Sequence, residues 1–171
     1  MTPPPSIRIR PAGPADAELV AELIEELNAH QREPTGHVTV EAVRRDGFDP
    51  APEFKVLLAE HDGRVGGYAL YHPTWSTEWG ERGFYLYDLF VREEARGHGL
   101  GRALMAALAT EAKAQGRTFL WWCSKEWNHE AHEFYARLGA IEETLRAHAL
   151  FGEALDKLAA SDRPESSGGP G

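Results

Sequence analysis

The stretch Arg96-Gly97-His98-Gly99-Leu100-Gly101 lies between a strand-like run ending at Val91 and an amphipathic helix predicted over 100–115. Glycines let successive backbone N–H groups point into one concavity without obstruction by Cβ atoms. The N-terminus of the following helix adds partial positive charge, and arginines at 92, 96 and 102 add cations. The stretch therefore predicts a cradle for a diphosphate, with a tight strand-to-helix connection as the alternative. No Gly-Lys-Ser/Thr follows it, which excludes a P-loop.

Hydrophobic periodicity on both sides of this stretch predicts strands interleaved with helices. The predicted strands cover 6–10, 54–60, 65–71, 84–91 and 118–123, with one or two more within 141–151. The predicted helices cover 14–30, 39–47, 100–115, 128–138 and 155–160. Asp62-Gly63 between two apolar runs predicts a hairpin, and residues 73–83 are predicted to form a loop. This order predicts an α/β (α+β) domain, with a mixed sheet and helices on its faces.

The length and composition set the class of protein. The chain has 171 residues, which predicts one domain, assigned to residues 1–160. A tail rich in Ser, Gly and Pro, residues 161–171, is predicted to be disordered. The single cysteine excludes an internal disulfide framework, and no apolar run is long enough to span a membrane. No secretory signal is visible at the N-terminus, so we expect a cytoplasmic protein.

The charge balance bears on the partners of the protein. A formal net charge of −9 argues against general nucleic-acid binding and is compatible with a cationic substrate. We therefore expect no nucleic-acid partner and no membrane partner.

The motif Arg96-x-x-Gly99-x-Gly101 after a strand resembles the acetyl-CoA-binding signature of the GNAT superfamily of N-acetyltransferases. Further motifs resemble its diamine (spermidine/spermine-type) acetyltransferase branch, and the resemblance covers residues near 6–158. These motifs are Ile7-Arg8-Ile9-Arg10-Pro11-Ala12, Asp46-Gly47-Phe48, Tyr85-Leu86-Tyr87-Asp88-Leu89-Phe90-Val91, Glu126-Trp127-Asn128, Phe134-Tyr135 and Leu138-Gly139-Ala140.

The resemblance implies a GNAT-like splayed mixed sheet in which the pantetheine arm of acetyl-CoA lies between two parallel strands. A backbone N–H near Leu89 or Phe90 is expected to hold the thioester oxygen as negative charge develops. The residues expected to bind acetyl-CoA are Phe90, Val91, Arg96, Gly97, His98, Gly99, Leu100, Gly101, Arg102, Asn128 and Tyr135.

Tyr135 is the leading candidate for a catalytic residue. In the family, the tyrosine of the matching Phe-Tyr pair lies near the cofactor sulfur, so Tyr135 is expected to protonate the departing thiolate as a general acid. Asn128 lies seven residues earlier, two turns away on the same predicted helix, and the family uses that asparagine for cofactor contact. The alternative is that Tyr135 packs half-buried on an amphipathic helix.

The chain departs from the branch where the amine is bound. An alkyl ammonium of pKa ~10.4 must lose a proton before it attacks, which costs roughly 4.6 kcal/mol at pH 7. The diamine enzymes carry Leu-Glu-Asp where this chain has Leu86-Tyr87-Asp88. Asp88 remains as a catalytic candidate, but adjacent strand residues are expected to point to opposite faces, so Asp88 would not simply replace the glutamate. Tyr87 is a candidate to relay a proton or to place its ring against a cation.

Aromatic side chains near this segment predict an acceptor site for a cation. The residues expected to contact substrate are Trp75, Trp79, Tyr87 and Glu126, although aromatic residues in strands commonly pack a core. His129 and His132 lie on one helix face without a third ligand in view, so no metal site is expected. Cys123 is expected to be a small buried strand residue.

Together these features predict an N-acetyltransferase that transfers an acetyl group directly, in a ternary complex, from acetyl-CoA to a small primary amine. A diamine, a polyamine or a lysine-like amino acid is the first choice of acceptor. The alternatives are another amine (an amino acid, a drug, a toxin or a protein amine) and a module that binds acyl-CoA without turnover. The family is commonly dimeric, so the resemblance also implies a homodimer.

Overall fold

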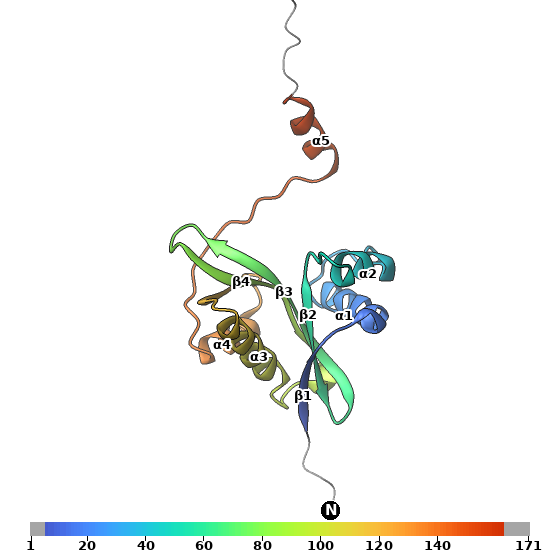
Figure 1. The fold of residues 1–171 in the computed structure, drawn as a ribbon, viewed down its shortest axis with the longest axis vertical. Helices are drawn as coiled ribbons and strands as arrows, with labels where there is room; N and C mark the ends of the chain where they lie inside the picture. The colour runs from blue at the N-terminus through green and yellow to red at the C-terminus, as the bar shows by residue number, and fades with distance from the viewer. Residues whose placement is uncertain (1–5, 163–171) are drawn as a thin grey trace, which may run out of the picture. The chain divides into compact units, whose positions relative to one another are not determined.

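Five strands form one mixed sheet in the order β1-β2-β3-β4-β5 (Figure 1). The computed structural model describes residues 6–162. Adjacent strands pair antiparallel from β1 to β4, whereas β4 and β5 pair parallel. The strands are β1 (Ile7–Pro11), β2 (Lys55–His61), β3 (Arg64–Ser76), β4 (Glu81–Val91) and β5 (Phe119–Trp122). The helices are α1 (Ala17–His30), α2 (Val40–Phe48), α3 (Leu100–Ala114), α4 (His129–Arg137) and α5 (Gly152–Ala160), with short 3₁₀ turns η1 (Pro14–Asp16) and η2 (Glu93–Ala95).

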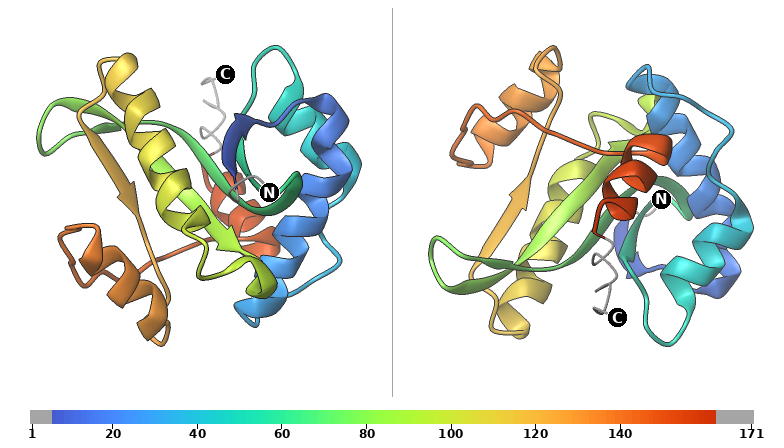
Figure 2. Two further views of the ribbon diagram at one scale, coloured as in Figure 1. Left: turned by 90° about the horizontal axis from the view of Figure 1, so that it is seen from below. Right: turned by 90° about the horizontal axis from the view of Figure 1, so that it is seen from above.

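Helices cover both faces of this sheet, α1 and α2 on one side and α3 on the other (Figure 2). On α1, Val20, Leu23 and Leu27 recur at helical spacing and are buried in one cluster with strand residues such as Tyr68 and Phe90. A second apolar stripe, on α3, buries Leu100, Leu104 and Leu108. Each fully buried leucine contributes about 1.5–3 kcal/mol. The predicted fold class, a mixed sheet with helices on its faces, is confirmed.

The hairpin predicted at Asp62-Gly63 is confirmed. Asp62 and Gly63 have φ of 51° and 77°, the left-handed values that a two-residue turn with the native strand twist requires.

The predicted loop over 73–83 is wrong, because β3 continues to Ser76 and β4 begins at Glu81. Pro73 is tolerated in the strand because β2 pairs with β3 no further than Tyr71, so the other edge of β3 needs no donor there.

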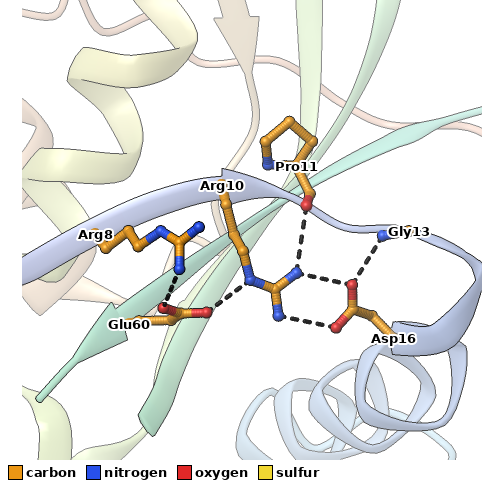
Figure 3. A network of polar contacts seen from close by, with 6 residues as sticks. All are labelled: Arg8, Arg10, Pro11, Gly13, Asp16 and Glu60. Carbon is orange, nitrogen blue, oxygen red and sulfur yellow. Dashed lines mark hydrogen bonds and ion pairs between the residues drawn. The ribbon is translucent and has the colours of Figure 1, made fainter. Parts of the chain in front are cut away.

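Arg10 on β1 joins the first strand to the beginning of α1 and to β2 (Figure 3). Its guanidinium donates to both carboxylate oxygens of Asp16, at 2.8 and 2.9 Å, and to Glu60 Oε1 at 2.6 Å. Asp16 also accepts from the backbone N–H of Gly13 at 2.8 Å. The hydrogen bonds from Arg10 hold the pKa of Asp16 below its usual value.

The described residues fall into two compact units, one up to His132 and one from Glu133 onward. The strands predicted within 141–151 are absent: this segment has no regular structure, and α5 follows it. A strand needs a neighbour to satisfy its backbone groups, and no described strand pairs with this segment. The assignment of residues 1–160 to one domain stays a prediction. The tail predicted over 161–171 lies outside the described residues, apart from a turn at 161 and 162.

Candidate active site

The edge of β4 opens where β5 leaves it. The two strands pair only from Gly83 opposite Phe119 to Leu86 opposite Trp122. Beyond Leu86, no described strand lies along this edge of β4. This opening is the splayed feature that the resemblance implies.

The hydrogen-bond alternation with β3 identifies which backbone groups face the opening. The N–H of Arg92 donates to Gly66 O at 2.8 Å, so these opposed residues form a hydrogen-bonded pair. In an antiparallel ladder such pairs alternate with pairs whose N–H and C=O groups point outward. Phe90 and Asp88 therefore bond toward β3, whereas Leu89 and Val91 present their backbone groups to the opening. Arg96 Nε donates to Val91 O from that side at 3.2 Å.

The glycine-rich stretch joins this edge to the N-terminus of α3. Gly97 and Gly99 have φ of 77° and 87°, values that side chains with a Cβ rarely adopt. Gly99 occupies the N-cap position of α3 and has no side chain to accept from the first helical N–H groups. Those N–H groups and the positive end of the helix dipole form the electrostatic setting that an anion favours.

The side chains around this loop differ in how they are held. Arg102 is exposed. Arg96 reaches Glu130 at 3.6 Å, and the His98 ring lies 4.4 Å from that of His61. Arg92, in contrast, turns to α1, where it forms ion pairs with Glu22 and Glu26. Arg96 and Arg102 are therefore the guanidinium groups near the predicted diphosphate cradle. Arg92, which was predicted to lie beside it, is paired with α1 instead.

A β-bulge at Tyr87 changes which side chains share a face of the sheet. Leu70 lies opposite Asp88 and the next residue, Tyr71, lies opposite Leu86, so Tyr87 has no opposite residue. Tyr87 stacks on His72, with ring centroids 4.8 Å apart and planes 28° apart, while Asp88 accepts from Tyr68 Oη at 3.0 Å. Tyr68 and His72 lie at even spacing on β3, on one face. The expectation that Tyr87 and Asp88 point to opposite faces is therefore wrong.

Three rings form an aromatic cluster beside this bulge, His72, Tyr85 and Tyr87. Tyr85 meets Tyr87 edge-on at 4.9 Å and lies 5.6 Å from His72. Burial, followed by a hydrogen bond with Cys123, raises the pKa of Tyr85 to about 12. Tyr87 is 55% exposed, so the outer side of the cluster is open to solvent. Cys123 is exposed rather than buried as predicted, because it lies just past the end of β5.

Asp88 lies deeper than the aromatic cluster. Burial raises its pKa above the usual carboxyl value, and the hydrogen bond from Tyr68 opposes that shift. Burial is also the main cause that raises the pKa of Tyr68, so the phenol remains a donor at neutral pH. Asp88 therefore places a carboxyl group on the same face of the sheet as the aromatic cluster.

The end of α1 bridges β4 and the loop that follows β5. His30 lies 6.3 Å from the Phe90 ring on β4. Arg32 lies over the Trp127 ring at 5.5 Å, and Glu33 forms an ion pair with Lys125. Glu126 lies exposed in the same loop, between Lys125 and Trp127.

The two tryptophans predicted to contact substrate lie farther along the β3–β4 hairpin. Trp75 lies opposite Arg82, and strand alternation places it on the sheet face opposite His72. Trp79 packs edge-on against Phe119 at 5.7 Å, at the beginning of β5. The structure does not bring either tryptophan to the aromatic cluster.

Two residues of the α4 region were predicted from the resemblance. Asn128 Oδ1 accepts from the N–H of Ala131 at 3.2 Å and so caps α4. Tyr135 lies on α4 with its ring 5.3 Å from that of Phe134, and burial raises its pKa to about 12. A phenol with this pKa is protonated throughout the neutral range, as a general acid requires.

Metal-ligating groups and membrane-spanning helices were sought among residues 6–162. In this range no group of three or more His, Cys, Asp or Glu side chains is arranged to hold a metal ion. No helix in this range has the length and apolar character needed to cross a membrane.

Residues 20–140 match the acetyltransferase (GNAT) family. The chain belongs to this family. It is accordingly a GNAT-family N-acetyltransferase. The thialysine N-epsilon-acetyltransferase of Bos taurus is 32% identical over 166 residues, which cover 90% of this chain and 97% of the relative. The human spermidine/spermine N(1)-acetyltransferase-like protein 1 is 27% identical over 143 residues, covering 79% of this chain and 20% of that protein.

A similar solved structure supports the fold assignment. An integron cassette protein from the mobile metagenome of V. cholerae superposes with a TM-score of 0.73 at 28% identity, covering 90% of this chain and 98% of that one. The family membership predicted from the glycine-rich stretch is confirmed.

Several candidate residues came only from the structure. The sequence analysis overlooked His72 and Tyr68, and it left open whether Leu89 or Phe90 turns its backbone N–H outward. Each of these features depends on the register between β3 and β4. The glycine-rich stretch over residues 96–101, in contrast, could be identified from its glycines.

Proposed function

We propose that this enzyme transfers an acetyl group from acetyl-CoA to a terminal primary amine of a small molecule, with a lysine-like amino acid as the first choice. The observation that carries the proposal is two sets of backbone N–H groups that face outward. One is at Leu89 and Val91 on the open edge of β4, and the other is in the first turn of α3. Arg96 links the two parts through Val91 O.

Two parts of the chain would hold acetyl-CoA. The pantetheine amides would pair with the backbone of Val91 as an added strand does, whereas the backbone groups of its neighbour Phe90 bond toward β3. The diphosphate would bind the amides of residues 97–102, beside Arg96 and Arg102. Asn128 and Tyr135 are included from the resemblance. When bound, acetyl-CoA supplies an acetyl group that is activated as a thioester.

The residues near the bulge would handle the charge that the reaction develops. The N–H of Leu89 faces the opening and would donate to the thioester oxygen as it becomes negative. Tyr135, which at a pKa of about 12 is protonated at neutral pH, would give its proton to the leaving sulfur. Asp88 would attract the ammonium group of the acceptor, and the exposed Tyr87 ring would contact the same cation.

The acceptor site proposed here lies on the α1 face of the β4 edge. The sequence similarity to a thialysine N-epsilon-acetyltransferase supports a lysine-like acceptor, and a diamine or polyamine has the same terminal group. Glu126 would meet a second positive charge on the acceptor. Trp75 lies on the opposite face of the sheet and Trp79 packs on Phe119, so neither tryptophan is assigned to this acceptor site.

The proposal includes direct transfer in a ternary complex, because the open edge and the aromatic cluster adjoin at Tyr87. A homodimer is also proposed. Large apolar side chains between 141 and 158 are exposed, among them Ile141 at 98% and Phe151 at 80%, and a second copy would cover them. The cytoplasmic location stays a prediction from the sequence.

A thiol-release assay with acetyl-CoA tests this function. The panel of acceptors contains lysine, thialysine, ornithine, putrescine, spermidine, other amino acids and an amine antibiotic. We expect the fastest release with an acceptor that has a terminal primary amine and a second polar group. Tight acetyl-CoA binding in calorimetry without release for any amine would contradict the proposal and favour a binding module or a protein acceptor.

A further inference from the structure

We propose that His72 is the general base that removes the proton from the acceptor ammonium, through Nε2 of its ring. This inference rests on the function proposed above and deepens it. It concerns a residue of β3 whose ring stacks on Tyr87.

The tautomer of His72 is set by its own strand. Its Nδ1 lies 2.7 Å from the carbonyl oxygen of Pro73. A carbonyl oxygen only accepts hydrogen bonds, so Nδ1 must carry the hydrogen. In the neutral ring the lone pair then lies on Nε2, at the opposite side of the imidazole, where it can accept a proton.

The position of the ring is set by stacking. His72 lies parallel to the Tyr87 ring at 4.8 Å and near Tyr85 at 5.6 Å, so aromatic contacts hold it from the β4 side. Tyr87 is the bulged residue, directly after the last residue of β4 that pairs with β5. The imidazole therefore lies at the point where the sheet opens and the acyl group would meet the amine.

The other ionisable groups near this point are less suited to the task. Asp88 is partly buried and already accepts from Tyr68 at 3.0 Å. Tyr85 has a pKa near 12, raised first by burial, and does not ionise near neutral pH. Cys123 forms a hydrogen bond with Tyr85. Asp88 then attracts the cation, and His72, partly exposed, accepts its proton.

The proton balance is simple. The ammonium R–NH₃⁺ gives one proton to Nε2, which passes it to water, and R–NH₂ attacks the acyl carbon. The new C–N bond forms as the C–S bond breaks, and the sulfur leaves with a proton from Tyr135. The amide nitrogen loses its second proton, which restores the tyrosine through solvent. The net reaction converts R–NH₃⁺ and acetyl-CoA to the acetamide, free CoA and one H⁺.

The test compares His72→Phe, which keeps an aromatic ring on Tyr87, with His72→Gln and with a control, Thr74→Val, two residues along the same strand face. The rate is measured as kcat/KM for the best amine of the panel between pH 5.5 and 9. A second acceptor is the same amine with two fluorine atoms on the second carbon from the nitrogen, which lowers the pKa of the ammonium group so that a large fraction of the amine is neutral at pH 7. At this pH only about one alkyl amine in ~2,500 is neutral.

We expect His72→Phe and His72→Gln to lower kcat/KM for the protonated amine by ~10²- to ~10⁴-fold at pH 7, the range of general-base catalysis. The loss for the fluorinated amine should be less than ~5-fold, and free imidazole should restore part of the rate of His72→Gln. Acetyl-CoA affinity should not change, and Thr74→Val should match the wild type.

Equal losses for the two acceptors would assign His72 a packing role and overturn the inference, as would an unchanged rate and pH profile in both variants. If the wild-type enzyme turned over no amine, the proposed function would fail and this inference with it. Turnover by the wild type together with unaffected His72 variants would overturn the inference alone.

Discussion

Replacing Gly99 by alanine tests whether the left-handed loop binds acetyl-CoA. Gly99 has φ of 87°, and the nearest atom that a new Cβ would meet is Ile7 Cδ1 at 3.7 Å, an ordinary contact. The perturbation is therefore conformational strain of about 1–2 kcal/mol rather than a clash. If the loop relaxes in the free protein to relieve this strain, acetyl-CoA binding must restore the left-handed conformation and its strain. Acetyl-CoA affinity then falls by ~5- to ~30-fold.

Gly36→Ala provides the matched control. Gly36 has φ of 82°, nothing within 4 Å of a new Cβ, and a position between α1 and α2, away from the loop. Calorimetric titration with acetyl-CoA and chemical unfolding are run on both variants. We expect Gly36→Ala to lose about 1–2 kcal/mol of stability with unchanged affinity. Equal acetyl-CoA affinity in Gly99→Ala and in the wild type would refute the role assigned to this loop.

Three further predictions concern separate parts of the molecule. Tyr135→Phe should lower kcat by ~10²-fold or more while acetyl-CoA affinity stays constant, and single-turnover kinetics would expose an unaffected chemical step. Gly83→Ala should lose about 1–3 kcal/mol in urea unfolding. The reason is that its Cβ would lie 2.5 Å from the Phe119 ring. Phe119→Leu should reduce that loss in the double variant, and independent effects would contradict this explanation. Asp16→Asn should be about 1 kcal/mol less stable than the wild type at pH 7. Because Arg10 lowers the pKa of Asp16, that difference should persist above pH ~4 and disappear as the pH falls further. A pH-independent difference in thermal unfolding would argue against the ion pair.

Features set by local chemistry were predictable from the sequence. Asp62-Gly63 specifies its turn because few other residues adopt its two positive φ values. The glycines before α3 and the apolar stripe of that helix likewise carry their own signal, and they were enough to identify the family.

Features that depend on a distant strand were not predictable. The bulge at Tyr87 exists only in the register with β3, and one unpaired residue inverts the face of every position beyond it. Strand alternation alone therefore predicted that Tyr87 and Asp88 point to opposite faces, whereas the two residues share a face in the structure. The prediction of strands within 141–151 was wrong for a related reason. A segment of strand-like composition forms a strand only beside a partner strand.

The open edge of β4 also governs how the purified protein should behave. Outward-facing backbone groups at Leu89 and Val91 offer a template on which any extended chain can add itself, including a misfolded copy of this protein. A ligand seated along that edge removes the template and, at a concentration one hundred times its Kd, adds about 2.7 kcal/mol of stability. Shelf life and solubility of this enzyme should therefore depend on the cofactor content of its storage buffer.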